Sequence, residues 1–452
     1  MKRKAVALML AVVMVILVTA GCSPISIEGN TLLRPPRATG DKAEIQDIIT
    51  QQAGGKYTFK YPQTGTNRSA ITMKSDKAQN EFAVALYSPN NDTKMNVSMI
   101  AYIKNEWKCI GTFSNAGAGV DRVMFSDLNN DGTDEVIIGW TGYGNTSKTL
   151  TAYSVADTAY EMTIDDTYDE MLIEDVTADA LNEIVLLSLG SQKNPSSIRL
   201  LQYSEQEKKP IGKYALELDP EITSFVNVTV GNIAQNQIGL VVDGEKNGGV
   251  LTSQIIYFDA QTNTLQNPLV SKLENDVYSN PTARKDTIYS RDADGDGMIE
   301  VPVITPMSAG TDVNAANVCN ITAWKQYSIY NKSLGTKLNT VINYNDRYYF
   351  TMPNRWMNGS VTAVTDPDTR QMTFYLWNSK TSSFGDKLLT IRRYTEEEWE
   401  QEDTADMIAL SNIDGTKSHA VFGGQIFITH ADETLNITPE EVTASAHSFW
   451  TN

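Results

Sequence analysis

One short pattern recurs along most of this chain and limits the folds that the chain can adopt. A strand-like apolar run begins near residues 81, 135, 183, 239 and 300, so the repeats are about 50 to 60 residues apart. After a polar turn, a second apolar run that ends on an aromatic residue follows each of these in the same phase. The paired runs are 81–84 with 99–102, 135–138 with 150–153, 183–186 with 200–203, 239–242 with 255–258, and 300–303 with 323–327.

Each repeat therefore offers about four short strands and no clear helix. Four-stranded units at this period are typical of β-propeller blades, in which a radial arrangement protects the strand edges. The sequence predicts a mainly β fold over residues 43–341, a β-propeller of four-stranded blades in which five repeats are visible and five to seven blades are possible. The alternative is an irregular series of β-hairpins that forms a sandwich.

Two of the repeats carry a short acidic loop directly before the first apolar run. Oxygen-bearing side chains at positions one, three, five and nine, with the backbone carbonyl of position seven, can surround one hard cation, and glycine at position six permits the sharp turn. We therefore expect structural Ca²⁺ in both loops. The ligand positions are Asp127, Asn129, Asp131, Thr133 and Glu135 in the first loop, and Asp292, Asp294, Asp296, Met298 and Glu300 in the second.

Two other interpretations fit part of this pattern. An EF-hand needs a bidentate glutamate at position twelve and a helix behind it, whereas Ile138 and Val303 stand there inside apolar runs. The loops are therefore expected to join strands. Asp, Asn and Gly also form plain tight turns without a metal, and for either loop alone this interpretation stays open. The recurrence of one spacing favours calcium.

A third repeat keeps only part of the pattern. Asp175, Thr177, Asp179 and Glu183 occupy the ligand positions, but Ala180 stands where glycine belongs. Because alanine resists the left-handed turn that glycine allows, metal binding by this loop is doubtful from the sequence.

The first 22 residues predict export and lipid attachment. Three basic residues precede an uncharged apolar run over residues 5–20, and Ala20 and Gly21 stand directly before Cys22. The pattern resembles the lipobox of bacterial lipoproteins, although Thr19 stands where leucine is usual. The resemblance implies a signal peptide over residues 1–21 and a lipid on Cys22, which anchors the protein on the extracytoplasmic side of a bacterial cell membrane.

An uncleaved anchor helix is the alternative at this end of the chain. The apolar run is shorter than the roughly twenty residues that a membrane span usually needs. Residues 22–42 contain Pro35 and Pro36 and show little periodicity, so they are expected to form a tether.

The composition excludes some partners and some classes of site. The chain has 37 basic and 55 acidic residues and a net charge of −18, which repels nucleic acid. Three histidines and three cysteines leave little material for a zinc site or a histidine-based triad. No phosphate-binding loop, dinucleotide-binding glycine pattern or nucleophile elbow occurs either. The sequence therefore predicts a protein that is not an enzyme.

The acidic loops that enter apolar strands resemble the FG-GAP or VCBS repeats of integrin-α-like β-propellers. The resemblance covers about residues 69–338 and implies that calcium lies in the loop between the first two strands of a blade. The fourth repeat has no acids in the corresponding stretch, and the first has no recognisable loop. The integrin type has seven blades, whereas five repeats are visible here.

Beyond residue 341 the period is lost, and residues 342–452 predict a small α+β domain. A closing helix is indicated by Thr438, Pro439 and Glu441, which together form a capping box with proline at the first helical position. The order of elements is similar to the PsbP-like fold, in which a strand marked by proline and then tryptophan, here Pro353 and Trp356, leads to a sheet and a terminal helix. The expected strands lie at residues 348–353, 360–364, 372–377 and 388–393.

Together these observations predict a lipid-anchored, extracytoplasmic protein whose calcium-stabilised propeller binds or scaffolds an unknown protein or polysaccharide ligand. The alternative is an extracellular polysaccharide-active enzyme, a lyase or a hydrolase, on a propeller scaffold. Acids that converge in one pocket would indicate the enzyme, and acids spread from repeat to repeat would indicate the binding module.

Overall fold

The computed structural model describes residues 40–77, 79–90, 92–144, 147–156, 158–191, 194–273, 278–309, 317–413, 420–427 and 433–449. The predicted signal peptide, the lipidation site Cys22 and the tether as far as residue 39 lie outside the described residues. Among the described residues, no helix is long enough and apolar enough to cross a membrane.

The described chain is mainly β, and its first four sheets are antiparallel and follow one another in sequence. The first sheet contains β1 (Tyr57–Phe59), β2 (Ile71–Ser75), β3 (Glu81–Pro89), β4 (Met95–Ile103) and β5 (Glu106–Asn115). The second contains β6 (Gly119–Ser126), β7 (Glu135–Thr141), β8 (Lys148–Ser154) and β9 (Tyr160–Tyr168). The third contains β10 (Glu170–Glu174), β11 (Glu183–Ser188), β12 (Ser197–Ser204) and β13 (Lys209–Glu217). The fourth contains β14 (Ile222–Ala234), β15 (Gln237–Lys246), β16 (Val250–Asp259) and β17 (Thr264–Gln266).

Two larger sheets follow, after a short pair of strands that links them to the fourth sheet. The linking pair is β18 (Ser271–Lys272) and β19 (Tyr278–Ser279). The fifth sheet contains β20 (Val301–Pro306), β21 (Asn320–Ser328), β22 (Ser333–Asn343), β23 (Tyr348–Thr351) and β29 (Ala446–Ser448). The sixth contains β24 (Val361–Asp366), β25 (Gln371–Asn378), β26 (Ser383–Thr395), β27 (Met407–Ala409) and β28 (Ala420–Ile426).

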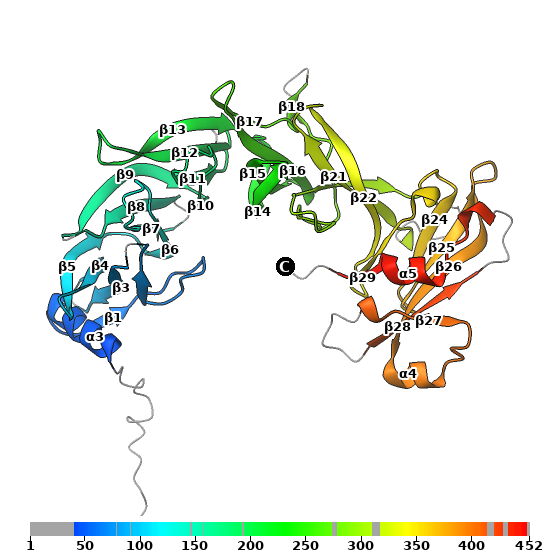
Figure 1. Cartoon of the computed structure of the whole chain (residues 1–452), viewed down its shortest axis with the longest axis horizontal. Helices are drawn as coiled ribbons and strands as arrows, with labels where there is room; N and C mark the ends of the chain where they lie inside the picture. Colours follow the sequence, from blue (N-terminus) through cyan, green and yellow to red (C-terminus); the bar gives the residue numbers. More distant parts are fainter. Residues whose placement is uncertain are drawn as a thin grey trace, which may run out of the picture.

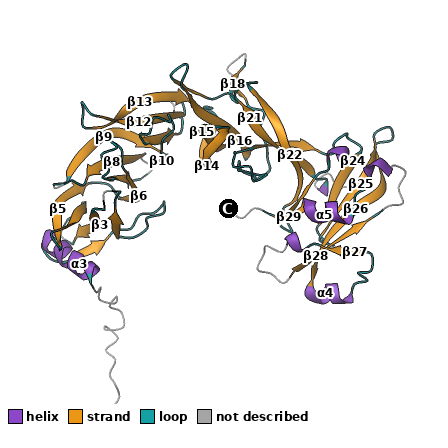
Figure 2. Ribbon diagram, viewed as in Figure 1, coloured by secondary structure: helices purple, strands orange, loops and turns teal. Residues whose placement is uncertain are grey.

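The helices of the described chain are short and lie at the two ends of the molecule (Figure 2). Both α4 and α5 begin with a capping box, made by Thr395 with Glu398 and by Thr438 with Glu441, and the second is the one predicted above. The α-helices are α3 (Asp41–Gln52), α4 (Glu396–Gln401) and α5 (Pro439–Ser445), and the 3₁₀-helices are η3 (Asn354–Trp356), η4 (Ser411–Ile413) and η5 (Glu433–Leu435).

Figure 1 shows the sheets in chain order along an arc, with first strands such as β6 and β10 on the inner side and last strands such as β9 and β13 on the outer side. The predicted four-stranded antiparallel units are confirmed for the second, third and fourth sheets, whereas the first and fifth sheets each have five strands. The two ends of the described chain do not meet in Figure 1, so the radial closure expected from the sequence is not seen there.

Neighbouring sheets pack face to face because their central strands are apolar on both faces. On β7, Val136 and Ile138 pack in a cluster with residues of the first sheet, whereas Ile137 packs with Ile184 and Leu186 of the third. Successive side chains of a strand point to opposite faces, so one unbroken apolar run serves two interfaces. This explains why the anchoring run of each repeat is continuous and does not alternate with polar residues.

The terminal faces of this stack are covered by other elements. Ile45 and Ile49 of α3 are fully buried against Ala83, Ala85 and Tyr87 of the first sheet. At the other end, one core cluster joins residues of the fifth and sixth sheets. An array of stacked repeats needs such covers, because its outermost faces have no further repeat to pack against.

The predicted boundary between residues 341 and 342 falls inside β22, since this strand continues to Asn343. Val341 packs in the same cluster as Trp356, Phe374 and Val442. The C-terminal segment therefore shares a core and a sheet with the fifth repeat, and the predicted domain limits stay a prediction.

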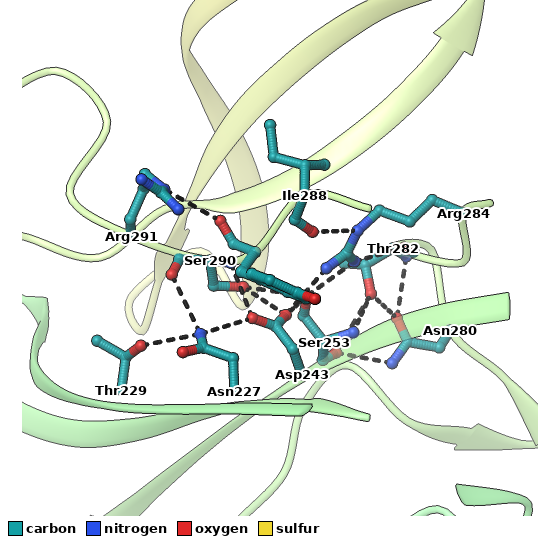
Figure 3. Close-up of polar contacts among 11 residues, drawn as sticks. Asn227, Thr229, Asp243, Ser253, Asn280, Thr282, Arg284, Ile288, Ser290 and Arg291 are labelled. Carbon is teal, nitrogen blue, oxygen red and sulfur yellow. Dashed lines mark hydrogen bonds and ion pairs between the residues drawn. The ribbon is translucent and has the colours of Figure 1, made fainter. Parts of the chain in front are cut away.

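A buried polar network holds the segment that links the fourth and fifth sheets (Figure 3). The Arg284 guanidinium lies 3.0 Å from Asp243 Oδ1, and neither side chain is exposed. The same carboxylate accepts hydrogen bonds from the hydroxyls of Ser253 (2.5 Å) and Ser290 (2.8 Å) and from the Ser290 backbone N–H (2.8 Å). Because Ser290 stands just before Asp292, the network fixes the point at which the chain enters the second acidic loop.

Candidate metal centres

The three acidic loops lie at equivalent places in successive repeats. We call residues 127–135, 175–183 and 292–300 loops L2, L3 and L5, after the repeat that contains each. L2 connects β6 to β7 and L3 connects β10 to β11, so both join the first two strands of their sheets. L5 leads into β20, and a bridge between Arg291 and Glu300 replaces the preceding strand.

The loops share one set of internal hydrogen bonds. The aspartate at position one accepts the N–H of position six, and the aspartate at position five accepts the N–H of position seven. The position-six bonds measure 3.0 Å to Asp127, 3.0 Å to Asp175 and 2.9 Å to Asp292. The position-seven bonds join Thr133 to Asp131 (2.8 Å), Leu181 to Asp179 (3.0 Å) and Met298 to Asp296 (2.9 Å).

L3 has the same backbone path as the other two loops despite its alanine at position six. Positions four and six both have positive φ angles in every loop. In L3 these positions are Ala178 (φ 57°) and Ala180 (φ 69°), which are strained conformations for alanine. The sequence indicated the turn at position six but gave no signal for position four, because Asn130, Ala178 and Gly295 share no residue type.

The glutamate at position nine is buried in all three loops and accepts a hydrogen bond from the loop backbone. Glu135, Glu183 and Glu300 are at most 1 % exposed, and one oxygen of each accepts the N–H of position two at 2.9 Å. Burial, as the largest cause, raises the pKa of all three, to about 8 for Glu135 and about 7 for Glu300, and nearby aspartates raise it further. A buried carboxylate of this kind is stable in its charged form when a cation lies beside it.

L5 contains an oxygen that has no partner. Glu300 Oε2 accepts the Ala293 N–H, but Glu300 Oε1 is buried and has no hydrogen-bond partner among the described residues. Carboxylate oxygens of Asp292, Asp294 and Glu300 lie within 4.8 Å of one another. A hard cation would satisfy this oxygen and offset the repulsion between the three carboxylates, so the residues of L5 fit a divalent metal.

L3, which the sequence left doubtful, also brings its acids together. Carboxylate oxygens of Asp175, Asp179 and Glu183 lie within 4.8 Å of one another. Thr177 donates its hydroxyl proton to Glu183 Oε1 at 2.7 Å, and Gln202 Nε2 donates to Asp179 at 2.6 Å. The acids of L3 are thus close enough for one cation and are partly neutralised by hydrogen bonds.

L2 has the full predicted pattern, but its three carboxylates do not all lie within that distance. The Asn129 amide Nδ2 lies between the acids and donates to Asp131 (3.0 Å) and to Glu135 (3.4 Å). Of the two strongest sequence predictions, L5 therefore has clustered carboxylates and L2 has an amide bridge.

A separate cavity of about 510 Å³ lies at the end of β11 opposite L3. Asp169, Arg199 and Glu217 line it together with several serine and threonine hydroxyls. Arg199 donates to the carbonyl of Thr167 at 2.6 Å and forms an ion pair with Asp166. No local sequence pattern marks this cavity, because its lining comes from the ends of several strands.

Comparison with known proteins gives no family for this chain. No family model and no curated protein matches it. Solved structures are similar at low identity: Sqt1 of Saccharomyces cerevisiae (10 % identity, 80 % of this chain and 85 % of that chain, TM-score 0.32), a candidate 6-phosphogluconolactonase of Bacteroides fragilis (11 %, 73 % and 92 %, 0.30) and an exo-β-1,3-galactanase of Phanerochaete chrysosporium (10 %, 75 % and 73 %, 0.25). These TM-scores are too low to assign a fold or an activity.

The expectation that this chain is not an enzyme is corrected by this comparison. It rested on the absence of a familiar catalytic motif, yet the similar structures include a galactanase and a candidate lactonase. Chemistry depends on the site that a scaffold carries, so a missing motif does not separate binding from catalysis here. The likeness gives this chain no particular activity.

The strain at Ala180 predicts that glycine is the better residue there. We expect Ala180→Gly to raise the free energy of unfolding by about 0.5–1 kcal/mol, because glycine adopts a positive φ angle without the clash that alanine suffers. Urea denaturation in the presence of a chelator measures the change. Ala43→Gly in α3 is the control and should lower stability by a similar amount. A loss of stability in both variants would contradict the strain.

The raised glutamate pKa values predict an inverse pH dependence of stability without metal. Between pH 5 and 8 the folded protein holds protons on Glu135 and Glu300 that the unfolded chain has released. Stability should therefore fall as the pH rises from about 5 to about 7 to 8, by up to about 1.4 kcal/mol per pH unit for each group, and should level off above the folded-state pKa values. Thermal unfolding in a chelator at several pH values measures the slope.

The double variant Glu135→Gln with Glu300→Gln is the control for this slope. Because neither amide titrates, the fall in stability between pH 6 and 8 should become shallower. An equal slope in the variant and the wild type would show that other groups set the pH dependence.

Proposed function

We propose that this protein is a lipid-anchored, extracytoplasmic module whose stacked sheets are stabilised by calcium and present a surface for binding or scaffolding. The observation that carries the metal-binding part is Glu300 Oε1, a buried carboxylate oxygen that has no hydrogen-bond partner among the described residues and lies beside two further carboxylates. The donors in the loops are oxygen atoms throughout, which is the set that a hard divalent cation prefers.

In L5 the cation would be held by Asp292, Asp294, Asp296 and Glu300 and by the backbone carbonyl of Met298. When bound, calcium would supply positive charge that neutralises carboxylates which otherwise repel one another. The equivalent ligands are Asp175, Thr177, Asp179 and Glu183 in L3, and Asp127, Asn129, Asp131, Thr133 and Glu135 in L2.

The proposed kinship with FG-GAP or VCBS repeats is supported by the position of the loops. L2 and L3 each join the first and second strands of a four-stranded sheet, which is where that resemblance puts calcium. The likeness of the C-terminal part to the PsbP-like fold stays a prediction. The number of blades is also left open by the open arc.

The second candidate function, action on polysaccharides, is favoured by one observation. The cavity beside β11 combines Asp169, Glu217 and Arg199 with hydroxyl groups that can bond a polyhydroxylated ligand. The three glutamates with raised pKa values lie one to a repeat and do not line this cavity. We therefore place a polysaccharide ligand, bound or processed, at the cavity and not at the loops.

Calcium should stabilise the folded protein by mass action. At a concentration about 100 times its dissociation constant, one site adds roughly 2.7 kcal/mol to the free energy of unfolding. We expect calorimetry on the full chain, purified in a mild detergent, to show a clear rise in Tm with millimolar calcium over chelator. The combined variant Asp127→Ala with Asp296→Ala should lose most of this rise.

The control for this experiment removes two acids elsewhere. Asp368→Ala with Asp386→Ala changes two exposed aspartates of the sixth-sheet region, so the calcium-dependent rise in Tm should persist. The proposal is wrong if wild-type Tm does not respond to calcium and isothermal titration detects no uptake.

The lipid anchor is proposed from residues 2–22 alone. Labelled fatty acid fed to cells that produce the protein should be incorporated into the wild type and not into Cys22→Ser. If both chains carry the label, or neither does, the attachment site is not Cys22.

A further inference from the structure

The third and fifth sheets carry a lysine at an equivalent β-bulge. The pairing of β12 with β13 shifts register between Leu200 and Leu201, one residue before Gln202, and leaves Lys213 without a cross-strand partner. The pairing of β21 with β22 shifts register between Trp324 and Lys325, one residue before Gln326, and leaves Lys337 without a cross-strand partner. Each lysine follows its glutamine by the same number of residues, so the two bulges occupy one position of the repeat.

Both bulge lysines reach the acidic loop of their own repeat. Lys337 Nζ lies 2.7 Å from Asp296 Oδ2 and 3.9 Å from Asp294 Oδ2. Lys213 Nζ lies 3.9 Å from Asp179 Oδ2 and also donates a hydrogen bond to the Gln202 amide oxygen. A bulge turns a side chain away from the regular alternation of its strand, and here it directs an ammonium group at metal-binding carboxylates.

A lysine occurs at the bulge only in the described repeats whose loops have clustered carboxylates, so the bulge alone does not explain its presence. The corresponding bulge of the first sheet, whose repeat has no acidic loop, carries Ile110. The wider bulge of the second sheet, at residues 164–166, contains no lysine. In loop L2 of the same repeat, the Asn129 amide lies between the acids. Among the described repeats, the two loops with three clustered carboxylates are the two that face a bulge lysine.

We propose that Lys337, and Lys213 in a looser arrangement, is a tethered counter-ion that competes with the divalent cation for the carboxylates of its loop. The inference rests on the proposed calcium binding and adds the residue that sets its strength. Without metal, the ammonium group holds Asp294 and Asp296 together. When the metal binds, the ammonium group leaves these carboxylates and its ion pair with Asp296 is broken.

The competition has a predictable size. An ammonium group about 6 Å from a divalent cation in water weakens its binding by roughly tenfold, and part of this effect is screened by salt. The lysine therefore shifts the calcium range in which L5 fills toward higher concentration. Loss of the lysine charge should destabilise the metal-free protein, because it removes an ion pair. It should stabilise the calcium-bound protein, because it removes the repulsion between the ammonium group and the cation.

The first test measures calcium affinity of the full chain in detergent by isothermal titration. We expect Lys337→Met to bind calcium at L5 about three- to tenfold more tightly than wild type and to have a lower Tm in chelator. Lys337→Arg keeps the charge and should leave the affinity within twofold of wild type. Lys332→Met, in the exposed turn of the same hairpin, removes an equal charge and should change neither property.

The second test follows the lysine itself. Amine acetylation followed by mass spectrometry should label Lys337 several-fold faster with saturating calcium than with chelator, whereas labelling of Lys332 should stay constant. Calcium uptake with unchanged Lys337 labelling and unchanged affinity of Lys337→Met overturns this inference and leaves calcium binding intact. No calcium uptake by the wild type overturns both.

Discussion

The structure depends on burial of the central strands on both faces. Ile137 of β7 packs toward the third sheet while its neighbours Val136 and Ile138 pack toward the first, and the same division is repeated from sheet to sheet. Each interface is then an apolar layer that neither sheet could bury alone. The order of the arc follows from this packing, because a repeat gains its stability from the repeats on either side. It also explains why α3 and the sixth sheet cover the two terminal faces.

This packing places the carboxylate of the position-nine glutamate beside the apolar layer between two sheets, where an unpaired polar group is costly. Position nine begins the central strands β7 and β11 in L2 and L3 and directly precedes β20 in L5, so the carboxylates of Glu135, Glu183 and Glu300 lie in the buried layer. One oxygen of each carboxylate accepts a hydrogen bond from the backbone N–H of position two. The other oxygen must find a donor or a cation, and that need connects the core of the repeat to the chemistry of its loop.

Much of this arrangement could be predicted from the sequence, because its signals are local. Continuous apolar runs mark the central strands, and the capping boxes at Thr395 and Thr438 mark helix starts. Properties that depend on distant contacts could not be predicted. The left-handed turn of Ala180 is held by its neighbours, the continuation of β22 to Asn343 depends on its pairing with β23, and the open arc depends on how the sheets pack against one another. The sequence also did not reveal Lys213 or Lys337, because a bulge is not visible in one strand alone.

The acidic side chains of the three loops are stabilised by different neighbouring groups, which donate hydrogen bonds or carry a positive charge. In L2 the amide of Asn129 bridges the acids, and in L3 Thr177 and Gln202 donate to them. In L5 Lys337 pairs with Asp296, and Glu300 Oε1 has no hydrogen-bond partner in the part of the chain that the structure describes. The loop framework is the same in all three, so the difference lies in side chains that approach it from other strands. A bound cation stabilises a loop less when amide groups already donate hydrogen bonds to its carboxylates than when a buried carboxylate oxygen has no hydrogen bond. On this reasoning L5 is the loop whose stability depends most strongly on a bound cation.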